Sequence, residues 1–373
     1  MIYLASPRIL VIGGGPAGLS ASVDLFEAGA DVVLVEKEPV LGGTPKRLHY
    51  SLIAPDLKPV ADVLDPLIRQ VESSTVTKKL NTTVSAIDHN GGRTGVTFVS
   101  ADGRTESDVF DAVVLATGFT HWDPHKKYEY GYGVYPDVID FKDFEKMLSD
   151  DNLARPSNGK MPARIGWLLC VGSRDRQVGK FYCCRLGCAV SIKQAMEVKK
   201  KHPEIDTYIY YMDIRTYGFW EDQLYWKAME DMNVKFIRGR IGAIGKGDEG
   251  NLLAMAEDTI LQRPSEVPFD MLVLTTGMEA SQGTVEMAKL LGLEMEEHGF
   301  VRPLEADSLP VHTTVENVFV AGTATGPKAI PDAIMEGSAA AMKALNYVRK
   351  NMSAKGKKMK TGSMKKDARA YAE

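Results

Sequence analysis

The chain has 373 residues, a formal net charge of −4, 44% hydrophobic residues and 25% charged residues. This length suffices for two or three domains, and the charge is not that of a nucleic-acid-binding or membrane-surface protein. No apolar run approaches the roughly 20 residues that a membrane span needs, and Met1 leads almost directly into a strand-like segment rather than a signal peptide. We therefore expect a cytoplasmic protein with no nucleic acid partner and no membrane span.

The first unit has the pattern of a compact βαβ fold, with a strand at 8–13, a helix at 16–28 and a strand at 31–36. The turn before its helix reads Gly-Gly-Gly-Pro-Ala-Gly and fits a dinucleotide-binding pattern. Gly13 permits the tight turn, Gly15 lets the backbone approach a pyrophosphate, and Gly18 lets the helix pack closely on the strand. Glu36, at the end of the second strand, is placed to accept hydrogen bonds from a ribose, and its charge argues against a 2′-phosphate.

The rest of the chain continues the α/β pattern. We expect a linker over 120–162 and a solvated, disordered basic tail over 351–373, with a docking segment for an acidic partner as the alternative for the tail. The other expected elements are a helix at 57–72, a meander of strands between 82 and 110, strands at 112–116, 165–170, 207–211, 271–274 and 318–322, and helices at 190–200, 220–232 and 331–349.

A second glycine-rich turn predicts FAD rather than NAD in the first domain. Residues 318–331 read VFVAGTATGPKAIP, and a long dinucleotide needs two such strand-to-helix turns. The pattern resembles the flavin disulfide-reductase superfamily, whose second FAD motif ends in Gly-Asp. Here Thr323 follows Gly322, so a hydroxyl must replace that carboxylate. The turn Ala116-Thr117-Gly118 also matches the superfamily. The alternative is that these are ordinary tight turns of an α/β protein.

The second α/β unit lacks the glycines of a nucleotide site. At the matching strand the sequence reads LLCVGSRD, so that only Gly172 remains of the pattern, with Arg174 and Asp175 in the turn. A pyrophosphate cannot approach the backbone closely past such side chains. We expect no NAD(P)H binding in this unit.

All four cysteines lie within 19 consecutive positions, at Cys170, Cys183, Cys184 and Cys188. A redox dithiol usually has the spacing C-x-x-C, which is absent. Structural zinc favours paired knuckles, and only Cys184 and Cys188 fit one. A [4Fe–4S] cluster tolerates irregular spacing because each iron takes one thiolate. The residues favour the cluster over zinc and over free or redox-active thiols.

The segments CVGSRDRQVGKFYCCRLGCAVSIKQA (170–195), DIRTYG (213–218), FIRGRIGAI (236–244) and GTATGPKAIPDAI (322–334) resemble the A-type flavin subunit of heterodisulfide reductases, the HdrA family. The short form, with LGGTPKRLHYSLIAPD (41–56), looks most like the HdrA-like subunit of bacterial sulfur oxidisers. This chain lacks the additional cysteine-rich ferredoxin segments and so can hold one cluster. Its cysteine spacing also departs from the family pattern, which leaves the role of Cys184 the least secure.

The resemblance implies an FAD-binding Rossmann-like fold of the thioredoxin-reductase type, with a second α/β domain carrying an iron–sulfur cluster. The expected domains are an FAD-binding domain over 1–125 and 286–350, an inserted NAD(P)-domain-like unit over 126–285, and the tail 351–373. The expected cluster ligands are Cys170, Cys183, Cys184 and Cys188. The expected FAD contacts are Gly13, Gly15, Pro16, Ala17, Gly18, Glu36, Lys37, Gly43, Thr44, Val84, Ala116, Thr117, Gly118, Gly322, Thr323, Lys328, Ile330 and Pro331.

Lys193 is the candidate catalytic residue, as the one charged residue in AVSIKQAM (189–196). One interpretation is a lysine that extends from an apolar helix to water. The other is an ammonium near the flavin N5 that shifts the flavin potential. The family resemblance, which has a lysine at the same offset from its last cysteine, supports the second.

We expect an electron-transfer protein with one FAD and one [4Fe–4S] cluster. The resemblance implies a homodimer or pseudo-dimer in a larger complex with B- and C-type heterodisulfide-reductase-like subunits and a lipoate-binding protein, in sulfur oxidation. Two alternatives stay open. One is a stand-alone FAD-dependent disulfide oxidoreductase, and the other is a non-catalytic flavin-binding assembly subunit.

Overall fold

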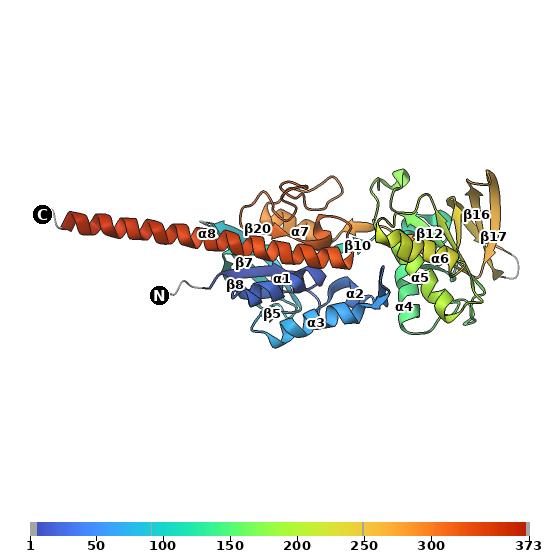
Figure 1. Ribbon diagram of the computed structural model, residues 1–373, viewed down its shortest axis with the longest axis horizontal. Helices are drawn as coiled ribbons and strands as arrows, with labels where there is room; N and C mark the ends of the chain where they lie inside the picture. Colours follow the sequence, from blue (N-terminus) through green and yellow to red (C-terminus); the bar gives the residue numbers. More distant parts are fainter. Residues whose placement is uncertain (1–5, 91, 248–249, 371–373) are drawn as a thin grey trace.

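The computed structural model describes residues 6–90, 92–247 and 250–370, with side chains described as far as 352. Figure 1 shows two α/β units along the long axis, with the N-terminal and C-terminal parts of the chain together in one and the middle of the chain in the other. The middle of the chain thus forms a unit of its own between the two parts of the first unit.

A parallel sheet forms the centre of the first unit, which is called the FAD-binding domain below after the cofactor that its sequence predicts. Its strands lie in the order β20-β9-β1-β2-β5. They are β1 (Arg8–Ile12), β2 (Asp31–Val35), β5 (Thr77–Lys79), β9 (Ala112–Leu115) and β20 (Val318–Val320). β1 and β9 are apolar because both faces of the sheet are covered.

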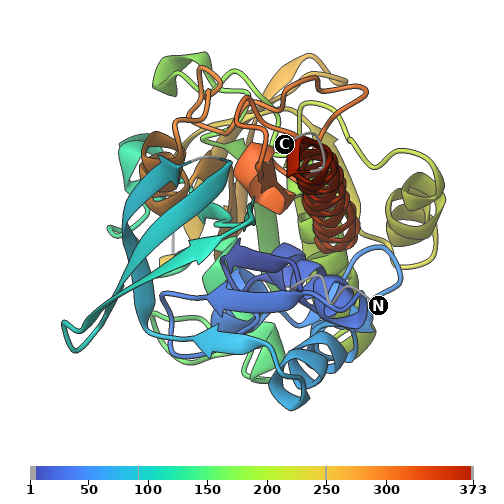
Figure 2. The ribbon, with the colours of Figure 1, turned by 90° about the vertical axis from the view of Figure 1, so that its left-hand side faces the viewer.

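One face of this sheet packs against α1 (Pro16–Glu27), α3 (Val60–Ser73) and α8 (Ile330–Ala370). The other face packs against α7 (Gln282–Leu291) and the antiparallel meander β6 (Thr82–Asn90), β7 (Arg93–Ser100) and β8 (Thr105–Phe110). Figure 2 shows the meander on one side of the sheet and the helices on the other. The predicted βαβ unit and meander are confirmed.

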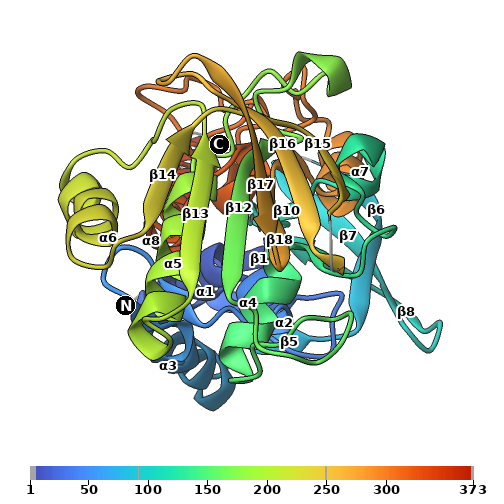
Figure 3. The ribbon, with the colours of Figure 1, turned by 90° about the vertical axis from the view of Figure 1, so that its right-hand side faces the viewer.

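The second domain repeats the plan around a parallel sheet in the order β11-β18-β12-β13-β14. The strands are β11 (Val138–Asp140), β12 (Arg164–Val171), β13 (Asp206–Tyr211), β14 (Lys235–Arg238) and β18 (Met271–Thr276). α4 (Phe141–Ser149) and α5 (Gly187–Lys201) cover one face. The meander β15 (Ile241–Lys246), β16 (Leu252–Asp258) and β17 (Arg263–Phe269) covers the other, as Figure 3 shows.

The prediction of a linker over 120–162 is wrong in part, because this segment contains β11 and α4. The side chain of Asp140 caps α4 by accepting hydrogen bonds from the backbone N–H groups of Lys142 (2.9 Å) and Asp143 (3.0 Å). Phe141, Phe144 and Leu148 follow at helical spacing and are buried. A capping residue before an apolar stripe is a helix signal that the abundance of Tyr, Asp and Pro in this segment obscured.

Two helices also differ from prediction. The aromatic segment predicted as one helix over 220–232 begins as a π-helical stretch, Glu221–Trp226, and continues as α6 (Lys227–Glu230). α8 does not end near Arg349 but continues to Ala370, and Figure 1 shows it extending beyond the body of the protein. The Lys, Met and Ala residues of 351–370 favour a helix. The composition of this segment had suggested a disordered tail instead. Residues 371–373 of the predicted tail lie outside the described residues.

Strands β10 (Phe119–His121) and β19 (Met278–Ala280) join the two domains as an antiparallel pair. A short hairpin of the FAD-binding domain, β3 (Leu52–Ile53) and β4 (Lys58–Pro59), also reaches the second domain. Of the helices in the described part of the chain, none is long and apolar enough to cross a membrane.

Candidate functional site

The first glycine turn lies between β1 and α1 at the carboxyl edge of the parallel sheet. Gly13 has a φ of +108°, and a Cβ on it would lie 2.4 Å from the carbonyl oxygen of Ala116. A Cβ on Gly18 would lie 1.8 Å from the carbonyl oxygen of Gly13. Both positions require glycine, because the turn packs on the end of β9 and α1 packs directly on the turn.

Gly15 differs from these two because it faces open, backbone-lined space. The nearest atom to a Cβ on Gly15 would be the Cα of Gly43, at 3.8 Å. Gly43 has a φ of +62° and begins α2 (Gly43–Arg47). α1 begins at Pro16 without a side-chain cap, so no capping side chain competes for the N–H groups of its first turn. Such N–H groups and the positive end of a helix suit a pyrophosphate, so these residues fit the predicted cofactor FAD.

Glu36 is buried at the end of β2, beside this turn. Its Oε2 accepts a hydrogen bond from the backbone N–H of Gly14 (2.6 Å), and its Oε1 accepts one from that of Glu38 (2.9 Å). A carboxylate has about four acceptor positions, so both oxygens keep capacity for a further donor such as a ribose hydroxyl. The structure therefore places Glu36 against the glycine turn, where its predicted role requires it.

The second glycine-rich turn lies against the first. Gly322, between β20 and α8, has a φ of +67°, and a Cβ on it would lie 2.9 Å from the Cβ of Ala17. The Oγ1 of Thr323 lies 3.9 Å from the position of a Cβ on Gly118. The three predicted turns thus meet at one edge of the sheet, although they are separated by up to about 300 residues in sequence.

Lys328 lies between this turn and α8. Its ammonium donates to the Oγ1 of Thr325 at 2.5 Å and lies 3.4 Å from the carboxylate of Glu336, whose other oxygen accepts the N–H of Gly322 at 2.9 Å. Burial lowers the pKa of Lys328. Ile330 and Pro331 form the first turn of α8. Lys328 therefore helps to hold the turn in place.

The remaining predicted contacts differ in exposure. Lys37 is exposed, with its ammonium 4.0 Å from Glu38. Val84 is buried in the core between the sheet and the meander. Ala116 is buried, and the hydroxyl of Thr117 lies 2.8 Å from that of Thr284 in α7. Thr44 is partly exposed within α2.

In the second domain, side chains fill the corresponding turn. A Cβ on Gly172 would lie 2.0 Å from the indole ring of Trp122. Arg174 forms a bidentate ion pair with Asp213. Asp175 is buried and pairs with Lys127 at 2.9 Å and with Arg240 at 2.5 Å. The sequence prediction identified Arg174 and Asp175 but missed Trp122, which comes from the connection after β10.

The four cysteines occupy the end of β12, the following loop and the first turn of α5. Cys170, Cys184 and Cys188 are buried, and Cys183 is partly exposed. The backbone N–H of Cys184 donates to the Oγ of Ser173 (3.0 Å), and the thiol of Cys188 donates to the carbonyl oxygen of Asp213 (3.8 Å). Burial raises the pKa of Cys170 to about 11 and that of Cys188 to about 12.

Cys183 and Cys184 form a directly interacting pair. A hydrogen bond between their thiols lowers the pKa of Cys183 to about 6 and raises that of Cys184. The charges of Cys170 and Cys183 also raise the pKa of Cys188, so the four sulfurs share one neighbourhood. Within the described residues, however, no group of three or more Cys, His, Asp or Glu side chains is arranged to hold a metal ion. The ligand role of the cysteines therefore stays a prediction.

Lys193 is buried in α5 and forms an ion pair with Glu145 of α4. The interpretation in which this lysine extends to water is therefore wrong. Its ammonium also donates to the hydroxyl of Ser51, in the FAD-binding domain, at 3.1 Å. Ion pairing of this kind is what makes a buried lysine tolerable. The prediction missed Glu145. The sequence signal for it was an acidic residue on the apolar side of α4, the side that is buried.

A model of the pyridine nucleotide-disulphide oxidoreductase family matches residues 7–153 and 195–337. The chain belongs to this family. It is therefore an oxidoreductase, and the stretch between the two matched segments contains all four cysteines.

The predicted resemblance to the A-type component of heterodisulfide reductases is confirmed. The chain is 32% identical over 416 residues to the A-type iron-sulfur component of the CoB–CoM heterodisulfide reductase of Methanocaldococcus jannaschii, covering 89% of this chain and 63% of that protein. It is 38% identical over 237 residues to the A-type component of the H2:CoB-CoM heterodisulfide,ferredoxin reductase of Methanothermobacter thermautotrophicus, covering 62% of this chain and 36% of that protein. The chain thus spans about a third to two thirds of the length of these relatives.

Solved structures show the same fold. Thioredoxin reductase of Lactococcus lactis matches with a TM-score of 0.62 and 15% identity, covering 92% of this chain and 100% of that one. Thioredoxin reductase of T. acidophilum matches with a TM-score of 0.59 and 17% identity, covering 91% and 97%. The fold is therefore the FAD-binding α/β fold of the thioredoxin-reductase type.

Proposed function

We propose that the chain binds one FAD and one [4Fe–4S] cluster and transfers electrons between them. The observation that carries the proposal is the difference between the corresponding turns of the two domains. The FAD-binding domain keeps a backbone cradle at Gly15 and Gly43, whereas side chains fill the matching turn of the second domain and four cysteines gather beside it. A nucleotide site and a thiol site in adjacent domains suit an electron-transfer flavoprotein.

For FAD, the turn from Gly13 to Gly18 would hold the pyrophosphate, and Glu36 would accept hydrogen bonds from the ribose. Gly322 and Thr323 would lie along the ribityl chain, where the hydroxyl of Thr323 is a neutral donor or acceptor. When bound, FAD supplies exchange between two-electron and one-electron chemistry. The residues of the chain would orient it.

For the cluster, the donor set has the right chemistry, because thiolates are the usual ligands of such clusters. Cys170, Cys183 and Cys188 are the proposed ligands, with Cys184 as the fourth. The two arginines near this site, Arg174 and Arg215, supply positive charge that favours thiolates: both lower the pKa of Cys183.

Lys193 is proposed as the residue that tunes the flavin. It carries a buried charge at the junction of the two domains, bonded to Ser51 of the domain that would hold FAD. An ammonium beside the flavin N5 would stabilise added electron density and raise its potential. Glu145 would hold this ammonium in place through the ion pair.

We further propose that the chain is one component of a heterodisulfide-reductase-like complex in cytoplasmic sulfur oxidation. The names of its relatives as A-type components support an assembly with B- and C-type subunits. The resemblance of residues 41–56 supports a sulfur-oxidising context, with a homodimer or pseudo-dimer core and a lipoate-binding protein as partner.

Anaerobic purification followed by a redox titration with visible and EPR spectroscopy tests the proposal. We expect one FAD and about four irons per chain. Iron near zero together with stoichiometric zinc would contradict the cluster half of the proposal, and absence of flavin would contradict the other half.

A second candidate is a stand-alone disulfide oxidoreductase, favoured by the pairing of Cys183 with Cys184. The partly exposed Cys183, with its pKa of about 6, is the thiolate that such chemistry needs. Mass spectrometry after mild oxidation would find a disulfide between these two residues if this candidate is right, and the protein would bleach rapidly with NADH.

A further inference from the structure

A short segment of the FAD-binding domain makes a second connection to the other domain. We define it as the latch segment, residues 50–58, which contains β3, the turn that follows it and the first residue of β4. The chain itself crosses between the domains at the strand pair β10 and β19. A two-stranded connection permits twisting about its own axis, so contacts away from it decide whether the domains rotate.

Ser51 is the polar centre of the latch segment. Its backbone N–H and its hydroxyl both lie 2.9 Å from the Oε1 of Glu145. The same hydroxyl lies 3.0 Å from the Oε2 of Glu197 and accepts from the ammonium of Lys193 at 3.1 Å. One serine of the first domain therefore bonds three charged side chains of the second. Glu145, Glu197 and Lys193 are all buried, which makes each of these bonds costly to break.

The polar contacts are flanked on both sides. Ala54 and Leu57 pack against the apolar core of the second domain. On the other flank, the hydroxyl of Tyr50 lies 2.9 Å from the Nε2 of His121 in the connecting strand β10. Burial lowers the pKa of His121 to about 3, so this pair is neutral and stays bonded at physiological pH.

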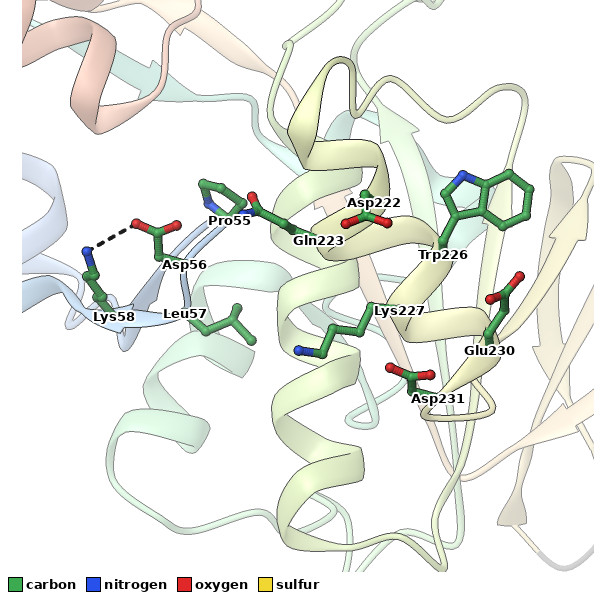
Figure 4. Close-up of a pocket in the computed structure, with 10 residues that line it drawn as sticks. All are labelled: Pro55, Asp56, Leu57, Lys58, Asp222, Gln223, Trp226, Lys227, Glu230 and Asp231. Carbon is green, nitrogen blue, oxygen red and sulfur yellow. Dashed lines mark ion pairs between the residues drawn. The ribbon is translucent and has the colours of Figure 1, made fainter.

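The other residues of the turn line a pocket between the two domains. Figure 4 shows Pro55, Asp56 and Lys58 on one side of a pocket of about 720 Å³, with Asp222, Trp226 and Lys227 of the helical segment on the other. Asp56 pairs with Lys58 within the hairpin, at 3.2 Å, rather than across the pocket. The attachment of this segment is thus concentrated at Ser51, Ala54 and Leu57. The loop after β12 adds further contacts between the domains: Tyr182 packs against His298, with ring centroids 4.5 Å apart, and Arg185 lies 3.8 Å from the carboxylate of Asp332.

We propose that the latch segment fixes the two domains in one relative orientation, and that Ser51 is a positioning residue for the pair Lys193–Glu145. The geometry supports this because the contacts of Ser51, Ala54 and Leu57 lie on elements other than β10 and β19, so rotation of the second domain about its connection must break them. The position of Lys193 at the junction would then be constant. This last consequence rests on the proposed role of Lys193, whereas the fixed orientation does not.

The chain contains a matched control. Ser157 donates both its backbone N–H (2.9 Å) and its hydroxyl (2.7 Å) to Asp137, and Arg155 pairs with the same carboxylate at 2.9 Å. This arrangement resembles that of Ser51 and Glu145 but lies entirely within the second domain, and Ser157 is exposed. Ser157→Ala therefore removes a serine–carboxylate hydrogen bond without touching the junction.

Single-molecule FRET on the full chain tests the proposal, with dyes on azide-bearing residues that replace the exposed Glu72 and Lys200. The wild type and Ser157→Ala should show one narrow population. Ser51→Ala should add a second population of roughly a tenth of the molecules or more. Ser51→Thr, which keeps the hydroxyl, should restore the single population.

Hydrogen exchange supplies a second readout. The amide of Ser51 should exchange about tenfold faster in Glu197→Gln, a milder variant that serves if Ser51→Ala fails to fold. A single unchanged population in Ser51→Ala, or unchanged exchange in Glu197→Gln, would overturn the proposal. Neither measurement uses flavin or iron, so a failure of the proposed function would show separately in the cofactor content.

Discussion

The indole ring of Trp122 covers Gly172, so that a methyl group on this glycine would lie 2.0 Å from the ring. Gly172 is all that remains of the second glycine pattern, and it allows this close packing of the ring. Together with the ion pairs of Arg174 and Asp175, the ring occupies the turn that a pyrophosphate would need.

We therefore predict that NADH reduces the isolated protein slowly. The expected result of stopped-flow mixing is flavin reduction over seconds or longer, because Trp122, Arg174 and Asp175 block backbone approach. Full reduction within milliseconds would show that NADH binds elsewhere or that this turn opens.

Two glycines of the first turn should respond differently to alanine. Gly18→Ala should destabilise the fold, because its Cβ would lie 1.8 Å from the carbonyl oxygen of Gly13. Gly15→Ala meets nothing closer than 3.8 Å, so it should leave the apoprotein nearly as stable but weaken FAD binding at least tenfold. Thermal unfolding and flavin fluorescence measure the two effects. Gly283→Ala, whose Cβ would also lie 3.8 Å from its nearest atom, is the control.

The cysteine variants test the ligand set. Cys170→Ala, Cys183→Ala and Cys188→Ala should each remove most of the broad visible absorption of a cluster. Iron analysis of anaerobically prepared protein is the measurement. An intact four-iron cluster in Cys184→Ala would show that another ligand fills the fourth position.

Removal of Lys193 alone should be strongly destabilising. Lys193→Met leaves Glu145 buried without its cation and should cost about 3 kcal/mol or more in the free energy of unfolding. Lys193→Met combined with Glu145→Gln should recover much of this loss, as measured by chemical denaturation. The double variant then permits a flavin titration, in which unchanged one-electron potentials would exclude the proposed tuning role.

Asp175 should contribute to acid sensitivity. Burial raises its pKa, but the hydrogen bonds and charges of Lys127 and Arg240 outweigh burial and lower it. Because the folded pKa lies below the unfolded value of about 3.9, its stabilisation is present above about pH 4 and is lost as the pH falls through the folded pKa. Asp175→Asn should make the free energy of unfolding less dependent on pH below 4, with Asp151→Asn on the surface as a comparison.

Local patterns were enough to predict the first βαβ unit, the meander that follows it and the glycine-rich turns. The tight turn at Gly13 and the close packing at Gly18 could be predicted because both depend on a short sequence pattern, whereas the contact of Gly15 with a pyrophosphate stays a prediction. The cysteines stand out because all four lie within 19 positions. α4 was missed although its cap and apolar stripe are local, because the composition of its surroundings resembles a linker.

Only the tertiary structure decided the contacts between residues that are far apart in the chain. Lys193 faces Glu145, 48 positions away, and Ser51, 142 positions away, so its local apolar helix could not show whether its charge reaches water or a partner. Trp122 and Gly172 meet across 50 positions for the same reason. The sequence determined which groups the protein carries, whereas only packing decided which charges are neutralised and which space is filled.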